Sequence, residues 1–100
     1  MTEFGLSVRE TEIIKSILQK YPQIERAVIF GSRAMNTFKP GSDVDIALWG
    51  KNIDGTLLNI LDNEFEESML PYFVDLLDFK NIKNQALKQH IQRVGKIFYQ

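Results

Sequence analysis

Residues 27–49 read AVIFGSRAMNTFKPGSDVDIALW and contain two short apolar segments separated by a polar loop. The first segment, residues 27–30, is rich in β-branched side chains and ends at Gly31, which is typical of a buried strand. The second, residues 43–49, alternates between polar and apolar side chains and ends at Gly50, which predicts another strand. A short helix is expected to begin at the glycine turn between them.

The chain before these strands predicts a helix over residues 8–20. Ser7 and Glu10 have the spacing of a capping box, in which each residue satisfies a backbone N–H of the other. Pro22 ends the helix because it has no N–H to donate. The apolar residues at helical spacing are Ile13, Ile14, Ile17, Leu18 and Tyr21.

The second half of the chain predicts a helix, a strand and a final helix. A helix is expected over residues 55–68 and a strand over residues 72–77. Asn81 is expected to cap the last helix. The apolar stripe of that helix consists of Leu87, Ile91, Val94 and Phe98.

These elements follow the order αβαβαβα. That order predicts an α/β (α+β) fold with a three-stranded mixed sheet flanked by helices. A length of 100 residues suits one domain, so residues 1–100 are expected to form a single unit.

Composition excludes several classes of function. The absence of cysteine rules out disulfides, thiolate metal sites and a cysteine nucleophile. A net charge of −1 provides no basic field, so direct nucleic-acid binding is not expected. The sequence shows neither a secretory signal pattern nor an apolar run of roughly 20 residues. A cytoplasmic location without membrane contact is therefore expected.

Two carboxylates stand out at the start of the second strand. Asp43 and Asp45 are two positions apart, so their side chains project from the same face of a strand. Like charges this close to a core repel each other and resist burial. A hard divalent cation such as Mg²⁺ would remove that penalty, because it binds carboxylate and phosphate oxygens.

A third carboxylate lies in the third strand, where Asp75 stands between Val74 and Leu76. If this strand lies beside the second, Asp75 can reach the same metal site. Three carboxylates from two strands can hold two metal ions, which can stabilise both the attacking and the leaving oxygen of a phosphoryl displacement. Asp78 has the wrong parity to share that face and is interpreted as a strand-end or capping residue.

The turn after the first strand has features of a phosphate-binding site. Gly31 allows close approach of the backbone, and free N–H groups at a helix start attract anions. The Ser32 hydroxyl can donate one more hydrogen bond. Arg33 carries a guanidinium suited to phosphate or carboxylate. A plain strand-to-helix turn has the same pattern, so the turn is informative only together with the acids.

The combination is more specific than its parts. Gly31 and Ser32, ten intervening residues, then Asp43 and Asp45 with a later strand acid resemble the nucleotidyltransferase superfamily of the DNA polymerase β type. Within it, the sequence GSRAMNTFKPGSDVDIALWG is most similar to the minimal nucleotidyltransferases of prokaryotes, the antitoxin partners of HEPN proteins. The resemblance covers residues 27–49 closely and residues 72–78 loosely.

The resemblance implies a role for each motif residue. Gly31 and Ser32, with Arg33 nearby, would hold the triphosphate of a nucleotide, most simply ATP. Asp43 and Asp45 would bind two Mg²⁺ ions, and Asp75 would bind the metal that activates the acceptor hydroxyl. The catalytic and metal-binding set is therefore Asp43, Asp45 and Asp75. One departure is that Met35 and Asn36 replace a basic residue and glycine. Asn36 can keep the turn, and Lys39 is a candidate to replace the lost charge.

The resemblance also implies a partner. Minimal nucleotidyltransferases act beside all-helical HEPN-type toxins, so the chain is expected to form a hetero- or homo-oligomer and to transfer AMP onto a partner tyrosine. The basic last helix and the apolar tail Ile97, Phe98 and Tyr99 are candidates for that contact. They could equally be helix packing and a frayed end.

Other interpretations remain open at this stage. The chain could be a non-catalytic binding module of the same fold, or an oligomeric nucleotidyltransferase for small molecules of the antibiotic type. His90 fits a surface or packed helix residue better than a ligand. Trp49 fits a core or edge aromatic residue better than a base-stacking platform.

Overall fold

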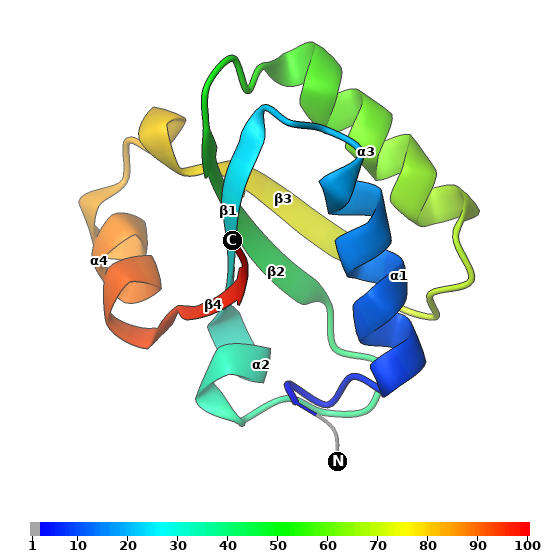
Figure 1. Ribbon diagram of the computed structural model, residues 1–100. Helices are drawn as coiled ribbons and strands as arrows, with labels where there is room; N and C mark the ends of the chain where they lie inside the picture. The colour runs from blue at the N-terminus through cyan, green and yellow to red at the C-terminus, as the bar shows by residue number, and fades with distance from the viewer. Residues whose placement is uncertain (1–2) are drawn as a thin grey trace.

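A sheet of four strands in the order β3-β2-β1-β4 forms the centre of the computed structural model, which describes residues 3–100 (Figure 1). β1 pairs antiparallel with both β2 and β4, whereas β2 and β3 are parallel. The sheet is therefore mixed, as the sequence predicts, but it has one strand more than expected. The strands are β1 (Ile24–Phe30), β2 (Val44–Gly50), β3 (Val74–Asp78) and β4 (Lys96–Tyr99).

Helices connect these strands in the predicted order. They are α1 (Val8–Gln19), α2 (Gly31–Met35), α3 (Gly55–Glu67) and α4 (Gln85–Val94), with a short 3-10 turn η1 (Phe79–Asn81) after β3. The predicted capping box of α1 is confirmed: Ser7 Oγ accepts from the Glu10 N–H at 3.1 Å, and Glu10 Oε1 accepts from the Ser7 N–H at 2.9 Å. No helix among residues 3–100 is long and apolar enough to cross a membrane.

The two faces of the sheet bury different side chains. α1 and α3 cover one face, and α4 lies on the other (Figure 1). In β2, Val44, Ile46 and Leu48 are buried in the cluster beneath α1 and α3, whereas Ala47 packs with Ile91 of α4. Because side chains alternate along a strand, Asp45 shares the parity of Ala47 and belongs to the α4 face.

The end of the chain differs from the sequence prediction. α4 ends at Val94, and Lys96–Tyr99 form β4 instead of continuing the helix. Phe98 is 7% exposed and packs in the cluster beneath α1 and α3, so it neither continues the predicted helical stripe nor offers its side chain for partner contact. Gly95 breaks the helix, and the β-branched and aromatic residues after it favour a strand.

The start of α4 also differs from the prediction. Its N-cap is Asn84, whose side chain accepts from the Leu87 N–H at 3.1 Å. Asn81 instead ends η1 and donates to Asp78 Oδ2 at 3.0 Å. Either asparagine satisfies the capping preference, so sequence alone did not separate them.

Candidate active site

The parallel pairing of β2 and β3 brings the predicted acids together. Asp45 is the direct register partner of Asp75, and on its other side Asp45 pairs with Phe30, the last residue of β1. The expectation that the third strand lies beside the second is therefore confirmed. Both acids have the parity of the α4 face and lie where β1 ends and where β2 and β3 begin.

Asp43 lies just before β2 and has an exposed side chain. Its distance in sequence from Asp45 keeps it at the same end of the sheet. The charge of its carboxylate acts on Asp45, which shows that the acids form one electrostatic group. Burial raises the pKa of Asp45 above its ordinary value, the negative charge of Asp75 raises it further, and that of Asp43 adds to the effect.

The imidazolium form of His90 and the Arg33 guanidinium would each lower the pKa of Asp45 and oppose those effects, but the net shift is upward. The Asp45 carboxylate is thus destabilised when it is ionised and alone. Any cation placed among the three acids would relieve that repulsion.

Gly31 lies against Asp45. Its φ of 72° is in the left-handed region, and a Cβ built on it would collide with Asp45 Oδ2. Only glycine combines this backbone conformation with this close approach. The structure therefore places the Gly31–Ser32 turn directly beside the Asp45 carboxylate, with both residues of the turn partly exposed.

The short helix after this turn closes with Asn36, which has a left-handed φ of 60°. The backbone N–H groups of Asn36 and Thr37 both donate to the Ser32 carbonyl oxygen, and the bond from Thr37 is 2.9 Å long. Asparagine tolerates this conformation better than most residues. The prediction that Asn36 preserves the turn despite the departure at residues 35–36 is confirmed.

The Arg33 guanidinium, which the sequence interpretation places near the triphosphate, is directed instead at backbone carbonyls of other segments. The residue is 3% exposed, and its guanidinium donates to Phe4 O at 2.7 Å and to Ser42 O at 2.7 Å. Its Nε also lies 3.3 Å from Asp43 O, and the Tyr72 ring packs 4.4 Å from its Cζ. The guanidinium thus fastens the loop before β2, and this geometry favours a positioning role over direct contact with phosphate.

His90 is a packed helix residue, as the sequence interpretation expects, but it also contacts the candidate site, which that interpretation did not anticipate. The Gly31 N–H donates to His90 Nε2 at 3.3 Å, and the imidazole meets the Phe30 ring edge-on, with centroids 6.1 Å apart. The available signal was spacing: His90 lies three residues after Leu87 and four before Val94, so all three share one helix face. That face packs on the sheet next to the acids.

Comparison with known families agrees with this geometry. The family described as polymerase beta nucleotidyltransferase matches residues 12–100, which is most of the chain. The chain belongs to the polymerase beta nucleotidyltransferase family.

One individual protein and two solved structures are also similar to this chain. The "probable protein adenylyltransferase MntA" of Haemophilus influenzae is 36% identical over 83 residues, which span 79% of this chain and 73% of that protein. A toxin–antitoxin crystal structure with AMP-PNP contains a chain that is 26% identical, with a TM-score of 0.75, covering 89% of this chain and 72% of that one. An MNT antitoxin in complex with a tri-AMPylated Shewanella oneidensis HEPN toxin shares the fold, with 24% identity, a TM-score of 0.68, and coverage of 89% of this chain and 68% of that one.

The carboxylates of this nucleotidyltransferase suit a hard divalent cation by their chemistry. Within residues 3–100, however, no group of three or more His, Cys, Asp or Glu side chains already has the geometry to hold a metal ion. Mg²⁺ usually takes one or two protein carboxylates and completes its octahedron with substrate phosphates and water. The acids, with Asp45 under electrostatic repulsion, fit an ion that arrives together with a nucleotide.

The remaining aromatic and acidic candidates of this nucleotidyltransferase have structural partners. Trp49 stacks on Phe79 at a centroid distance of 4.4 Å, with Arg26 4.5 Å from its ring. Asp78 is buried, pairs in register with Leu48 on the opposite parity, and accepts from Asn81. Both residues therefore lie apart from the acids, in agreement with the sequence interpretation.

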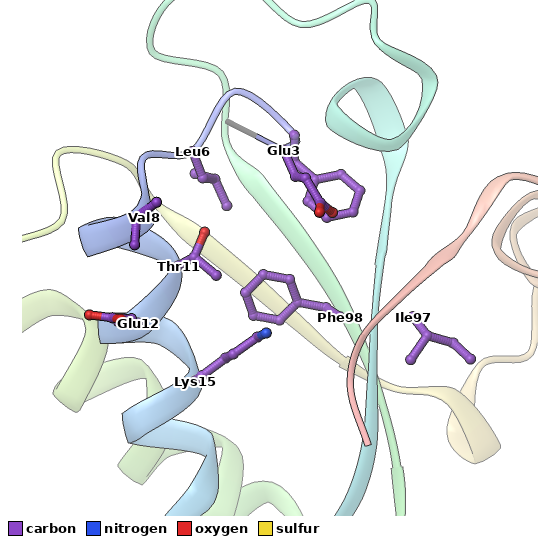
Figure 2. Close-up of a pocket in the computed structure, with 9 residues that line it drawn as sticks. Glu3, Leu6, Val8, Thr11, Glu12, Lys15, Ile97 and Phe98 are labelled. Atoms are coloured by element: carbon purple, nitrogen blue, oxygen red, sulfur yellow. The ribbon is translucent and has the colours of Figure 1, made fainter. Parts of the chain in front are cut away.

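A hollow of about 620 Å³ between α1 and β4 lies away from these acids (Figure 2). Figure 2 shows the Phe98 ring at its floor, with Lys15 reaching toward it from α1. None of Gly31, Ser32, Asp43, Asp45 and Asp75 lines this hollow. This hollow is thus separate from the candidate site at the end of the sheet where β2 and β3 begin.

Proposed function

We propose that this chain transfers AMP from Mg²⁺-bound ATP to a hydroxyl group of a HEPN-type partner protein, with a tyrosine as acceptor. The observation that carries the proposal is the direct pairing of Asp45 with Asp75 beside the Gly31 turn. Three carboxylates next to a glycine turn combine cation ligands with backbone room for a triphosphate.

In the proposed reaction, the acceptor oxygen forms a bond to the α-phosphorus of ATP. The bond from that phosphorus to the bridging oxygen of the β-phosphate breaks, and pyrophosphate leaves. Bound Mg²⁺ ions would stabilise charge on the attacking and leaving oxygens. Asp43 and Asp45 would hold those ions beside the nucleotide phosphates, and Asp75 would face the acceptor and take the hydroxyl proton. The chain contributes positioning and charge stabilisation rather than a covalent intermediate.

Two relatives support the substrate and the reaction. The Haemophilus influenzae relative is named as a probable protein adenylyltransferase, and it is 36% identical to this chain. The toxin–antitoxin structure at 26% identity was crystallised with AMP-PNP, an analogue of ATP. The name of the first relative supports a protein acceptor, and the ligand and composition of the second support an adenine nucleotide and a two-component complex.

The surface next to Asp75 fits the approach of such a partner. Phe73, two residues before Asp75, is 76% exposed, and Met69 in the preceding loop is 78% exposed. Between Phe73 and α3 lies a pocket of about 250 Å³, lined partly by the acidic Asp62 and Glu66. An acceptor segment with an apolar anchor and a basic residue would match this surface. The basic α4 remains a second candidate for partner contact.

The decisive experiment incubates the purified chain, its HEPN-type partner, Mg²⁺ and ATP labelled at the α-phosphate. Label is expected on the partner, and mass spectrometry should locate added AMP on a tyrosine. ATP labelled at the γ-phosphate serves as the matched control and should leave the partner unlabelled. Phe73→Ser should reduce labelling of the partner while leaving ATP binding unchanged. A complex that forms but carries no label would identify the chain as a non-catalytic binding module.

A further inference from the structure

His90 accepts a hydrogen bond from the Gly31 N–H, the backbone donor that a bound triphosphate would need. The Gly31 N–H donates to His90 Nε2 at 3.3 Å, so this nitrogen carries no proton and the imidazole N–H is at Nδ1. The ring is held edge-on against Phe30 and is only partly buried. Gly31, which this imidazole contacts, also lies against the carboxylate of Asp45. One imidazole therefore contacts the glycine turn that lies beside Asp45.

The Arg33 side chain, which follows the turn in sequence, is committed elsewhere. Arg33 is the nearest basic residue in sequence, but its guanidinium donates to the carbonyls of Phe4, Ser42 and Asp43. His90 is thus a side chain that already forms a hydrogen bond with the first amide of the Gly31–Ser32 turn. This contact joins α4, near the end of the chain, to the motif between β1 and β2.

We propose that His90 is a nucleotide-positioning residue that exchanges its hydrogen-bond partner when the triphosphate binds. In the free protein, Nε2 accepts the Gly31 N–H. When a phosphate oxygen takes that N–H, the imidazole turns on α4, its proton moves from Nδ1 to Nε2 through water, and Nε2 donates to the triphosphate. The inference rests on the proposed nucleotide-binding function and adds a side chain that forms a hydrogen bond with the bound triphosphate.

Imidazole suits this exchange because the same nitrogen can accept in one tautomer and donate in the other. Lysine and arginine can only donate, so neither could hold the Gly31 N–H in the free protein. Glutamine carries both an acceptor oxygen and a donor nitrogen at a similar reach. It is therefore the conservative replacement that should preserve the exchange.

The first test uses the fact that His90 is the one histidine of the sequence. Its imidazole ¹⁵N resonances can thus be assigned without ambiguity. In the free protein, Nε2 should have the shift of an unprotonated nitrogen. Saturation with Mg²⁺ and AMP-PNP should change it to that of an N–H nitrogen, whereas AMP should leave it unmoved. An Nε2 signal that stays unprotonated at saturating AMP-PNP would overturn the proposal.

The second test measures transfer kinetics. His90→Ala should raise the KM for ATP roughly tenfold, since a hydrogen bond to a charged phosphate is lost, while kcat changes by less than about twofold. His90→Gln should return the KM to within about threefold of the unmodified protein. Gln89→Ala, an exposed neighbour on the same helix, should change neither parameter. A structural role alone would lower stability without this KM pattern and would contradict the inference.

These outcomes separate the inference from the function on which it rests. If the unmodified protein neither binds ATP nor transfers AMP, the proposed function fails. If it binds AMP-PNP with Mg²⁺ but His90→Ala has an unchanged KM and the Nε2 signal does not move, only the role of His90 fails.

Discussion

Asp45 and Asp75 lie directly opposite each other across the parallel pair β2–β3, on the sheet face that carries α4. Like charges placed opposite each other on neighbouring strands are destabilising. The raised pKa of Asp45, caused first by burial and then by Asp75, records that repulsion. A fold that only needed stability would fill these positions with apolar residues. The arrangement is instead suited to a cation and the phosphate that it brings.

Asp75→Asn should lower AMP transfer at least about a hundredfold, because it removes the proposed proton acceptor and cation ligand while keeping the size of the side chain. Transfer is measured as label moved from α-labelled ATP to the partner. Asp78→Asn is the matched control, since Asp78 lies on the same strand but with the opposite parity and a partner in Asn81. Equal losses in the two variants would mean that the acids of β3 matter only for folding.

Asp45→Asn should make the metal-free protein more stable at pH 7, although it abolishes transfer. The folded state raises the pKa of Asp45. Such a group contributes stability that is fully present below its unfolded pKa and is lost as the pH rises through its folded pKa. At pH 7 the ionised Asp45 therefore destabilises the fold, and the uncharged asparagine removes that penalty.

The measurement for this prediction is urea unfolding in the presence of a chelator at pH 7 and at about pH 3, below the ordinary pKa of aspartate. The gain of Asp45→Asn should be present at pH 7 and should disappear near pH 3. A gain that is the same at both values would show that packing, and not charge repulsion, sets the stability of this position.

Sequence reasoning located the acids because it needed only strand parity and one pairing. Asp43 and Asp45 are two apart, and a parallel neighbour places Asp75 on the same face. Gly31 was identified only in combination with these acids, because a glycine at the end of a strand also fits a plain strand-to-helix turn. Each of these inferences depends on local pattern, which a sequence expresses directly.

The features that were missed depend on long-range packing. Phe98 continues the helical stripe of Leu87 and Ile91 at the right spacing, and only the break at Gly95 and the free edge of β1 turn it into strand β4. His90 contacts Gly31 across a separation of 59 residues in sequence. Arg33 follows the glycine turn, yet its guanidinium points to the loop before β2. In each case the tertiary contact decides between two locally reasonable interpretations.

Gly31→Ala should abolish transfer and destabilise the protein more than Gly41→Ala does. Both glycines have positive φ, of 72° and 85°, so alanine costs about 1–2 kcal/mol at either position. A Cβ at residue 31 also collides with the Asp45 carboxylate, whereas a Cβ at residue 41 meets nothing. The free energy of unfolding, measured with urea, should therefore fall further for Gly31→Ala than for Gly41→Ala. The difference between the two variants reports the close approach of residue 31 to the Asp45 carboxylate. Full activity in Gly31→Ala would contradict the proposed position of the triphosphate.

Arg33→Lys should lower the free energy of unfolding by about 2–3 kcal/mol, because lysine cannot reach the carbonyls of Phe4 and Ser42 together and leaves buried acceptors without donors. Arg26→Lys is the control, since that guanidinium packs over Trp49 and its replacement should cost no more than about 1 kcal/mol. The KM for ATP should change little in Arg33→Lys while kcat falls, because the loop carrying Asp43 loosens. A stable variant with a strongly raised KM would instead restore the original interpretation, in which Arg33 binds the triphosphate directly.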